Sequence, residues 1–121
     1  MKRDMDLIRK MVLAVEDSPS GFAPDALNFD DYTEEQVGYH AYLLVDAGLA
    51  LGADVTTMSS SSPEYVLRRL TWAGHEFADA CRNESIWNQA QDTVKKKAGS
   101  VTFDVLKELL VSLLRGVIGI A

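Results

Sequence analysis

The chain has 121 residues, of which 47% are hydrophobic and 25% charged, and this composition is typical of one folded domain rather than a disordered chain. A single cysteine excludes an internal disulfide framework and suits a reducing cytoplasm. The formal net charge of −6 is unevenly distributed, because residues 11–67 contain ten acids and no lysine or arginine.

We expect neither a signal peptide nor a membrane span in this sequence. The amino-terminal residues lack the apolar stretch and small-residue cleavage site of a signal peptide. The longest apolar run, residues 109–121, is interrupted by Arg115 and is shorter than the roughly 18 residues that a membrane span needs. We therefore expect a cytoplasmic protein that does not enter a membrane.

The first predicted element is a helix over residues 4–16. Its apolar residues recur at spacings of three and four and form one stripe: Met5, Ile8, Met11, Val12 and Val15. Asp4 and Asp6 are placed in the first turn, where a carboxylate interacts favourably with the helix dipole. Residues 22–31 are predicted to be extended, with a short strand near Leu27 as one alternative.

The second predicted helix, residues 33–47, has the clearest start and stop signals in the chain. Thr33 and Gln36 have the spacing of a capping box. Gly48 is expected to end the helix in the left-handed conformation, and Leu49 to pack back on the last turn.

A β-hairpin is predicted next. Its first strand covers residues 49–55, in which apolar side chains alternate with smaller or polar ones, as in a half-buried strand: Leu49, Leu51, Ala53 and Val55. The second strand covers residues 64–70. The serine-rich segment 59–63 joins the two strands as a loop.

Thr71 is predicted to cap a third helix. Its buried side is expected to contain either Trp72 or Ala73, together with Phe77, Ala80 and Cys81. Gly74, in the first turn, lowers helix propensity and is expected there to permit close packing.

Two further helices complete the expected elements. One starts near Glu84, carries Trp87, Ala90 and Val94 on its apolar side, and ends with Lys95, Lys96 and Lys97 before Gly99. The last helix is capped by Ser100 or Thr102 and has a broad apolar face.

Three blocks of the sequence are distinctive: residues 1–9 (MKRDMDLIR), 39–49 (YHAYLLVDAGL) and 70–83 (LTWAGHEFADACRN). Together they resemble a small family of bacterial and prophage proteins, domain of unknown function 2513. A helix ending in LxxAGL, a hairpin and then LTxxGxxF is also the order of elements in winged-helix domains. The resemblance implies a winged-helix-like fold and a bacterial or phage origin, and it implies no catalytic residues.

The expected fold class is therefore α+β and mainly helical. We predict one winged-helix-like domain over residues 1–121, with its core in residues 4–82 and a helical extension in residues 84–118.

The residues that could carry chemistry have simpler structural interpretations. His40 borders the buried face of its helix and is expected to bond to backbone or a nearby carboxylate. His75 and Asp79 would supply only half of a metal site, and Cys81 is expected to be a buried, inert thiol. Paired carboxylates at 30–31 and 34–35 surround a helix start, where negative charge is favourable. We therefore expect no enzyme activity, no cofactor and no metal.

DNA binding is the main alternative function. Many winged-helix proteins bind DNA through the helix before the wing, which here would be residues 33–47. The exposed positions of this helix are expected to hold Glu34, Glu35 and Asp46 and no cation. A basic patch for DNA would have to use other residues: Arg68, Arg69, Lys95, Lys96 and Lys97. Arg68 and Arg69 are neighbours on a strand, so only one of them is expected to point outward.

The last helix could bind a second copy of the chain, because its apolar face is broad for one packing surface: Leu106, Leu110, Leu113 and Val117. The sequence as a whole favours a non-catalytic module that binds an unidentified protein partner. A DNA-binding transcriptional regulator is the alternative.

Overall fold

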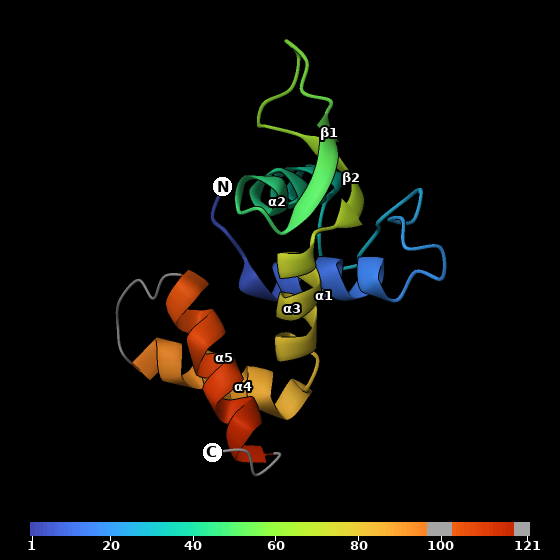
Figure 1. The fold of residues 1–121 in the computed structure, drawn as a ribbon. Helices are drawn as coiled ribbons and strands as arrows, with labels where there is room; N and C mark the ends of the chain where they lie inside the picture. Colours follow the sequence, from blue (N-terminus) through green and yellow to red (C-terminus); the bar gives the residue numbers. More distant parts are fainter. Residues whose placement is uncertain (97–102, 118–121) are drawn as a thin grey trace. The chain divides into compact units, whose positions relative to one another are not determined.

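A computed structural model describes residues 1–96 and 103–117. The elements in chain order are α1 (Met5–Glu16), α2 (Glu34–Asp46), β1 (Ala50–Asp54), β2 (Tyr65–Leu70), α3 (Trp72–Cys81), α4 (Glu84–Lys96) and α5 (Phe103–Val117) (Figure 1). The predicted α+β, mainly helical class is confirmed. None of the helices in these ranges has the length and apolar character needed to cross a membrane.

The chain divides into two compact units, Met1–Ala78 and Asp79–Ala121, which we describe separately. The first unit contains α1, α2, the hairpin and most of α3. The second contains α4 and α5.

Helix α1 begins one residue later than expected because Asp4 is its cap rather than part of its first turn. The Asp4 carboxylate accepts hydrogen bonds from the backbone N–H groups of Asp6 and Leu7 at 2.9 and 3.1 Å. The buried stripe contains Leu7, Ile8, Met11, Val12 and Val15, so Leu7 takes the place predicted for Met5, which is only partly buried.

Helix α2 begins and ends as predicted. Thr33 and Gln36 form both bonds of a capping box. At the other end Gly48 has φ +77°, and the Leu49 N–H donates to the Leu44 carbonyl at 2.9 Å. This wide turn around a left-handed glycine satisfies carbonyls that the helix would otherwise leave unpaired.

Gly48→Ala is expected to lower the free energy of unfolding by about 1 kcal/mol, because a Cβ in the left-handed region is strained. No heavy atom lies within 4 Å of the position that the new Cβ would take, so the backbone conformation is the only source of this cost. Urea denaturation followed by circular dichroism measures it. Gly48→Asn should cost less, since asparagine tolerates this conformation, and equal stability of wild type and the alanine variant would contradict the prediction.

Strands β1 and β2 pair antiparallel and pack their inner face on α2 (Figure 1). Ala50, Leu67 and Leu70 are buried on that inner face. Within the described residues, no strand forms in the segment 22–31, so the alternative of a short strand near Leu27 is wrong. The segment contacts the edge of β2 through a hydrogen bond from the Ala23 N–H to the Arg68 carbonyl at 2.7 Å.

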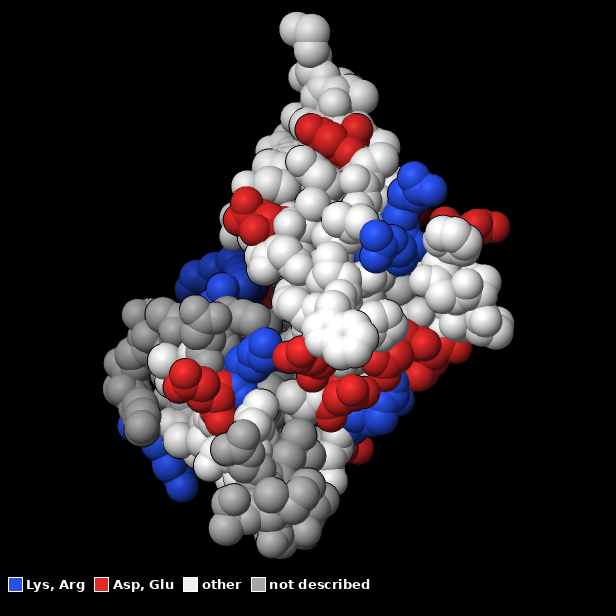
Figure 2. Space-filling model, viewed as in Figure 1, with Lys and Arg blue, Asp and Glu red and all other residues white. Residues whose placement is uncertain are grey.

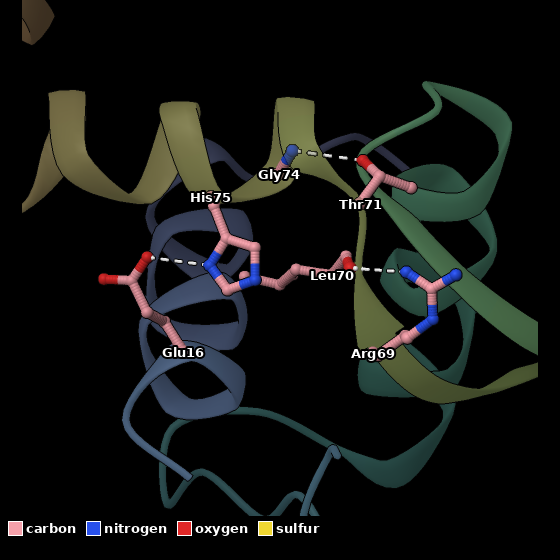
Figure 3. A network of polar contacts seen from close by, with 6 residues as sticks. All are labelled: Glu16, Arg69, Leu70, Thr71, Gly74 and His75. Atoms are coloured by element: carbon pink, nitrogen blue, oxygen red, sulfur yellow. Dashed lines mark hydrogen bonds and ion pairs between the residues drawn. The ribbon is translucent and has the colours of Figure 1, made fainter. Parts of the chain in front are cut away.

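Thr71 caps α3 as predicted. Its hydroxyl accepts the Gly74 N–H at 3.1 Å (Figure 3). The same hydroxyl donates to the Gly48 carbonyl at 2.6 Å. Gly74 is buried, and a Cβ at this position would overlap the Leu49 carbonyl. The close packing that the sequence predicted at Gly74 is therefore present, and it explains why the residue is glycine.

In the second unit, α4 and α5 pack against each other. Asn83 caps α4 by accepting the Ile86 N–H at 3.0 Å. Buried side chains come from both helices: Ile86, Trp87, Ala90, Leu106 and Leu110. Gly99, Ser100 and Thr102, the predicted end of α4 and caps of α5, lie outside the described residues.

Candidate interaction surface

The face of the hairpin that points away from α2 carries exposed apolar side chains. Leu51 is 42% exposed and Val66 53%, and Val55 just beyond β1 is also exposed. Ala53 lies opposite Val66 in the register, so these four residues share one face. We call Leu51, Ala53, Val55 and Val66 the outer hairpin face. Figure 2 shows a largely uncharged area over the hairpin, with Lys and Arg side chains on one side of it and Asp and Glu side chains above it and on the opposite side.

This orientation corrects the sequence-based interpretation of the first strand. The alternation of Leu49, Leu51, Ala53 and Val55 is real, but its last three members face outward. The reason is that Leu49 is buried as part of the turn that ends α2, and the strand itself begins with Ala50 facing the helix. The sequence therefore indicated three of the four residues of the outer hairpin face, but it missed Val66, included the buried Leu49 and did not give the direction of the face.

Arg68 and Arg69 are both exposed, which corrects the expectation that only one of them points outward. The ladder shifts between Leu51 and Gly52, so that Leu51 pairs with Arg69 and Gly52 with Leu67. Arg68 is the extra residue of this bulge, and a bulge interrupts the strict alternation of faces. Both arginines are consequently exposed next to the outer hairpin face, since Arg69 pairs with Leu51.

Trp72, the first residue of α3, is 81% exposed. Of the two alternatives for the buried side of α3, Trp72 is thus wrong, and Ala73 is the half-buried one. The Trp72 indole N–H donates to the Glu76 carboxylate at 2.6 Å, which fixes the ring on the outside of the helix. An exposed tryptophan is unusual on a free surface and is enriched at protein interfaces.

Helix α2 presents acids to solvent. Its exposed positions are Glu34, Glu35 and Asp46, as the sequence predicted, and the helix contains no lysine or arginine. A surface of this charge repels the phosphates that supply most of the affinity of proteins for DNA.

Comparison with known proteins places the chain in a family. Residues 2–100 match the family described as "Hypothetical protein (DUF2513)". The chain belongs to this family. A relative from Haemophilus influenzae (strain ATCC 51907 / DSM 11121 / KW20 / Rd), described as "Uncharacterized protein", is 36% identical over 112 residues, which cover 90% of this chain and 92% of the relative. No solved structure matches.

The predicted resemblance is thereby confirmed at the level of the family. The matched range contains the hairpin and α1 to α4. The family description assigns no activity, so the chemistry of this DUF2513 protein has to be judged from its own residues.

His40 is a structural residue in this DUF2513 protein. It is 1% exposed, and its Nε2 accepts the Asp4 N–H at 2.8 Å. Because Nε2 is the acceptor, the ring proton is on Nδ1, which donates to the Gln36 carbonyl at 2.7 Å. The expectation of a buried histidine bonded to backbone is confirmed, and both ring nitrogens are occupied by backbone groups of α2 and of the α1 cap.

The Asp4 cap also receives a hydrogen bond from a tyrosine. The Tyr32 hydroxyl donates to the second carboxylate oxygen of Asp4 at 3.1 Å. Burial, and then the negative charge of Asp4 and its hydrogen bond, raise the pKa of Tyr32 above its usual value. Tyr32 therefore remains a hydrogen-bond donor to Asp4 throughout the neutral range.

The other candidate chemical residues lie apart from one another. His75 is about half exposed, and its Nδ1 lies 3.2 Å from the Glu16 carboxylate (Figure 3). Cys81 is fully buried, as expected. Within the described residues, no three His, Cys, Asp or Glu side chains are grouped as they would be to hold a metal ion.

The predicted basic and self-association residues are placed as follows. Arg68 and Arg69 lie in the first unit, Lys95 and Lys96 are exposed in the second, and Lys97 is outside the described residues. On α5, Leu106 and Leu110 are buried within the chain itself, Leu113 is half-buried, and the side chain of Val117 is outside the described set. Self-association through α5 stays a prediction, and Leu106 and Leu110 are unable to contribute to it without unpacking.

Proposed function

We propose that this protein is a non-catalytic interaction module of bacterial or phage origin, which binds another protein through the outer hairpin face of a winged-helix-like scaffold. The order helix, helix, hairpin, helix supports the scaffold assignment. A non-catalytic role is supported by His40 and Cys81, which are buried in structural positions.

The observation that carries the proposal is the outward direction of Leu51, Val55 and Val66 on a two-stranded sheet. Contiguous exposed apolar side chains are costly on a free monomer and mark contact surfaces. The neighbouring Arg68 and Arg69 are of a residue type enriched at protein interfaces.

Capture from a bacterial lysate tests this proposal. The immobilised protein is expected to retain one or more proteins after nuclease treatment, and Leu51→Asp with Val66→Asp should abolish retention, because each aspartate places a charge in an apolar contact. Phe22→Asp, a matched change at an exposed apolar residue outside the face, should retain the same proteins. Retention that depends on nucleic acid, or that the double variant leaves intact, would contradict the proposal.

DNA binding as a transcriptional regulator is the second candidate, favoured by the exposure of both Arg68 and Arg69. The acidic exposed positions of α2 argue against it. A regulator of this kind would have to bind the duplex through the hairpin border rather than through α2.

We expect no retardation of random duplex DNA by this protein in a gel-shift assay at moderate salt, because the 11–67 segment supplies no cation for phosphates. Submicromolar binding that weakens with salt, is strengthened by Glu34→Lys and is abolished by Lys96→Glu would reverse the ranking of the two functions.

A further inference from the structure

A groove of 340 Å³ lies in the first unit between α2, β2 and the segment that precedes α2. Its apolar lining consists of the accessible side chains of Leu27 and Val66 and of buried ones beneath them, among them Met11 and Val37. Three carboxylates, from Asp25, Glu34 and Glu64, belong to the same lining. The groove thus combines an apolar lining with three acids on exposed residues.

Gly38 gives Glu64 its place beside α2. A Cβ on Gly38 would lie 2.8 Å from the Glu64 Cγ, so any larger residue at this helical position would displace the glutamate. Glycine lowers helix propensity in the middle of a helix. Its presence here is explained by the close approach of the Glu64 side chain to the helix.

The negative charge of the groove is uncompensated in the described part of the chain. No lysine or arginine occurs between Lys10 and Arg68, and no ion pair joins a basic side chain to Asp25, Glu34 or Glu64. Glu35 is a neighbouring acid outside this groove. Unlike the groove acids, its carboxylate accepts hydrogen bonds from the hydroxyls of Ser61 and Ser62. The groove acids therefore have capacity for a cation that comes from another molecule.

We propose that this groove binds a lysine or arginine side chain of a basic peptide segment in a protein partner. Such side chains lay an aliphatic stem on apolar surface and keep the charged head in a polar setting. Here the stem contacts Leu27 and Val66, which are the accessible apolar side chains, and the head bonds to the carboxylates. Charge complementarity selects a basic segment over an acidic one, and the groove borders the outer hairpin face, with which it shares Val66.

A ¹H–¹⁵N NMR titration tests the groove with the peptide acetyl-Ala-Lys-Leu-Ala-amide. The amide signals of Val37, Gly38 and Ala41 are expected to shift and saturate. The norleucine counterpart, which keeps the stem and lacks the charge, should bind about tenfold more weakly, and the glutamate counterpart should cause no shift. Equal responses to the three peptides, or saturation by spermidine with no response to the lysine peptide, would overturn the proposal.

Two variants test whether binding of the lysine peptide depends on the groove rather than on the general negative charge of the surface. Glu64→Gln and Gly38→Ala should each weaken binding of the lysine peptide, the second by displacing Glu64 from α2 while leaving the chain folded. Glu35→Gln removes the same charge outside the groove and should bind as wild type does. Unchanged affinity in Glu64→Gln and Gly38→Ala would overturn the proposal. The titration tests only whether the groove acids bind a cationic side chain, so its failure would leave the lysate experiment, which depends on Leu51 as well as Val66, as a separate test of the proposed function.

Discussion

His40→Leu is expected to lower the free energy of unfolding by about 2 kcal/mol, the usual cost of leaving a buried backbone group without its hydrogen bond. Leucine fills most of the space of the imidazole but accepts nothing from the Asp4 N–H, which the ring now binds at 2.8 Å. The loss also removes the polar contact that joins the cap of α1 to α2. Urea denaturation followed by circular dichroism measures the change.

His75→Leu is the matched control for this variant. His75 is half exposed and its partner is a surface carboxylate, so the same substitution should change stability by no more than about 0.5 kcal/mol. A His40 variant as stable as the His75 variant would show that the Asp4 N–H finds another partner. Long-range ¹H–¹⁵N spectra of the wild type should also show the proton on Nδ1 of His40.

Gly74→Ala is expected to destabilise the protein by about 2 kcal/mol, since the overlap of a new methyl group with packed backbone outweighs the gain of about 1 kcal/mol in helix propensity. The methyl group would meet the carbonyl of Leu49, and backbone at the junction of α2 and β1 yields less easily than a side chain. Thermal unfolding and urea denaturation should both report the loss.

The same substitution at Gly38 is not expected to lower stability. There the new methyl group meets only the flexible Glu64 side chain, so Gly38→Ala should be neutral or stabilising. If Gly74→Ala and Gly38→Ala changed stability alike, the close approach of α3 to Leu49 would not be the reason for the glycine at position 74.

Local signals in the sequence predicted the ends of elements well. The capping box at Thr33 and Gln36, the left-handed Gly48 and the Thr71 cap depend on residues a few positions apart, and all three are present. Such signals are readable because the interacting groups are near neighbours along the chain.

The direction of the hairpin and the contacts of His40 were harder to predict. Alternation in a strand defines two faces but does not say which one the helix covers, and the bulge at Arg68 shifts the pattern by one residue. The partner of His40 lies 36 positions away along the chain, at Asp4. The groove needs contributions from α1, α2 and β2 together, so no short segment could indicate it.

Photo-crosslinking in bacterial cells tests most directly whether the outer hairpin face binds protein. A p-benzoylphenylalanine placed at Val66 is expected to form a covalent adduct with another protein, whereas the same residue at Asp46, exposed at the end of α2, should form little or none. Protein adducts specific to position 66 are the predicted result. Adducts of equal yield at both positions, or none at position 66 when the protein is at its natural level, would contradict a protein contact at this face.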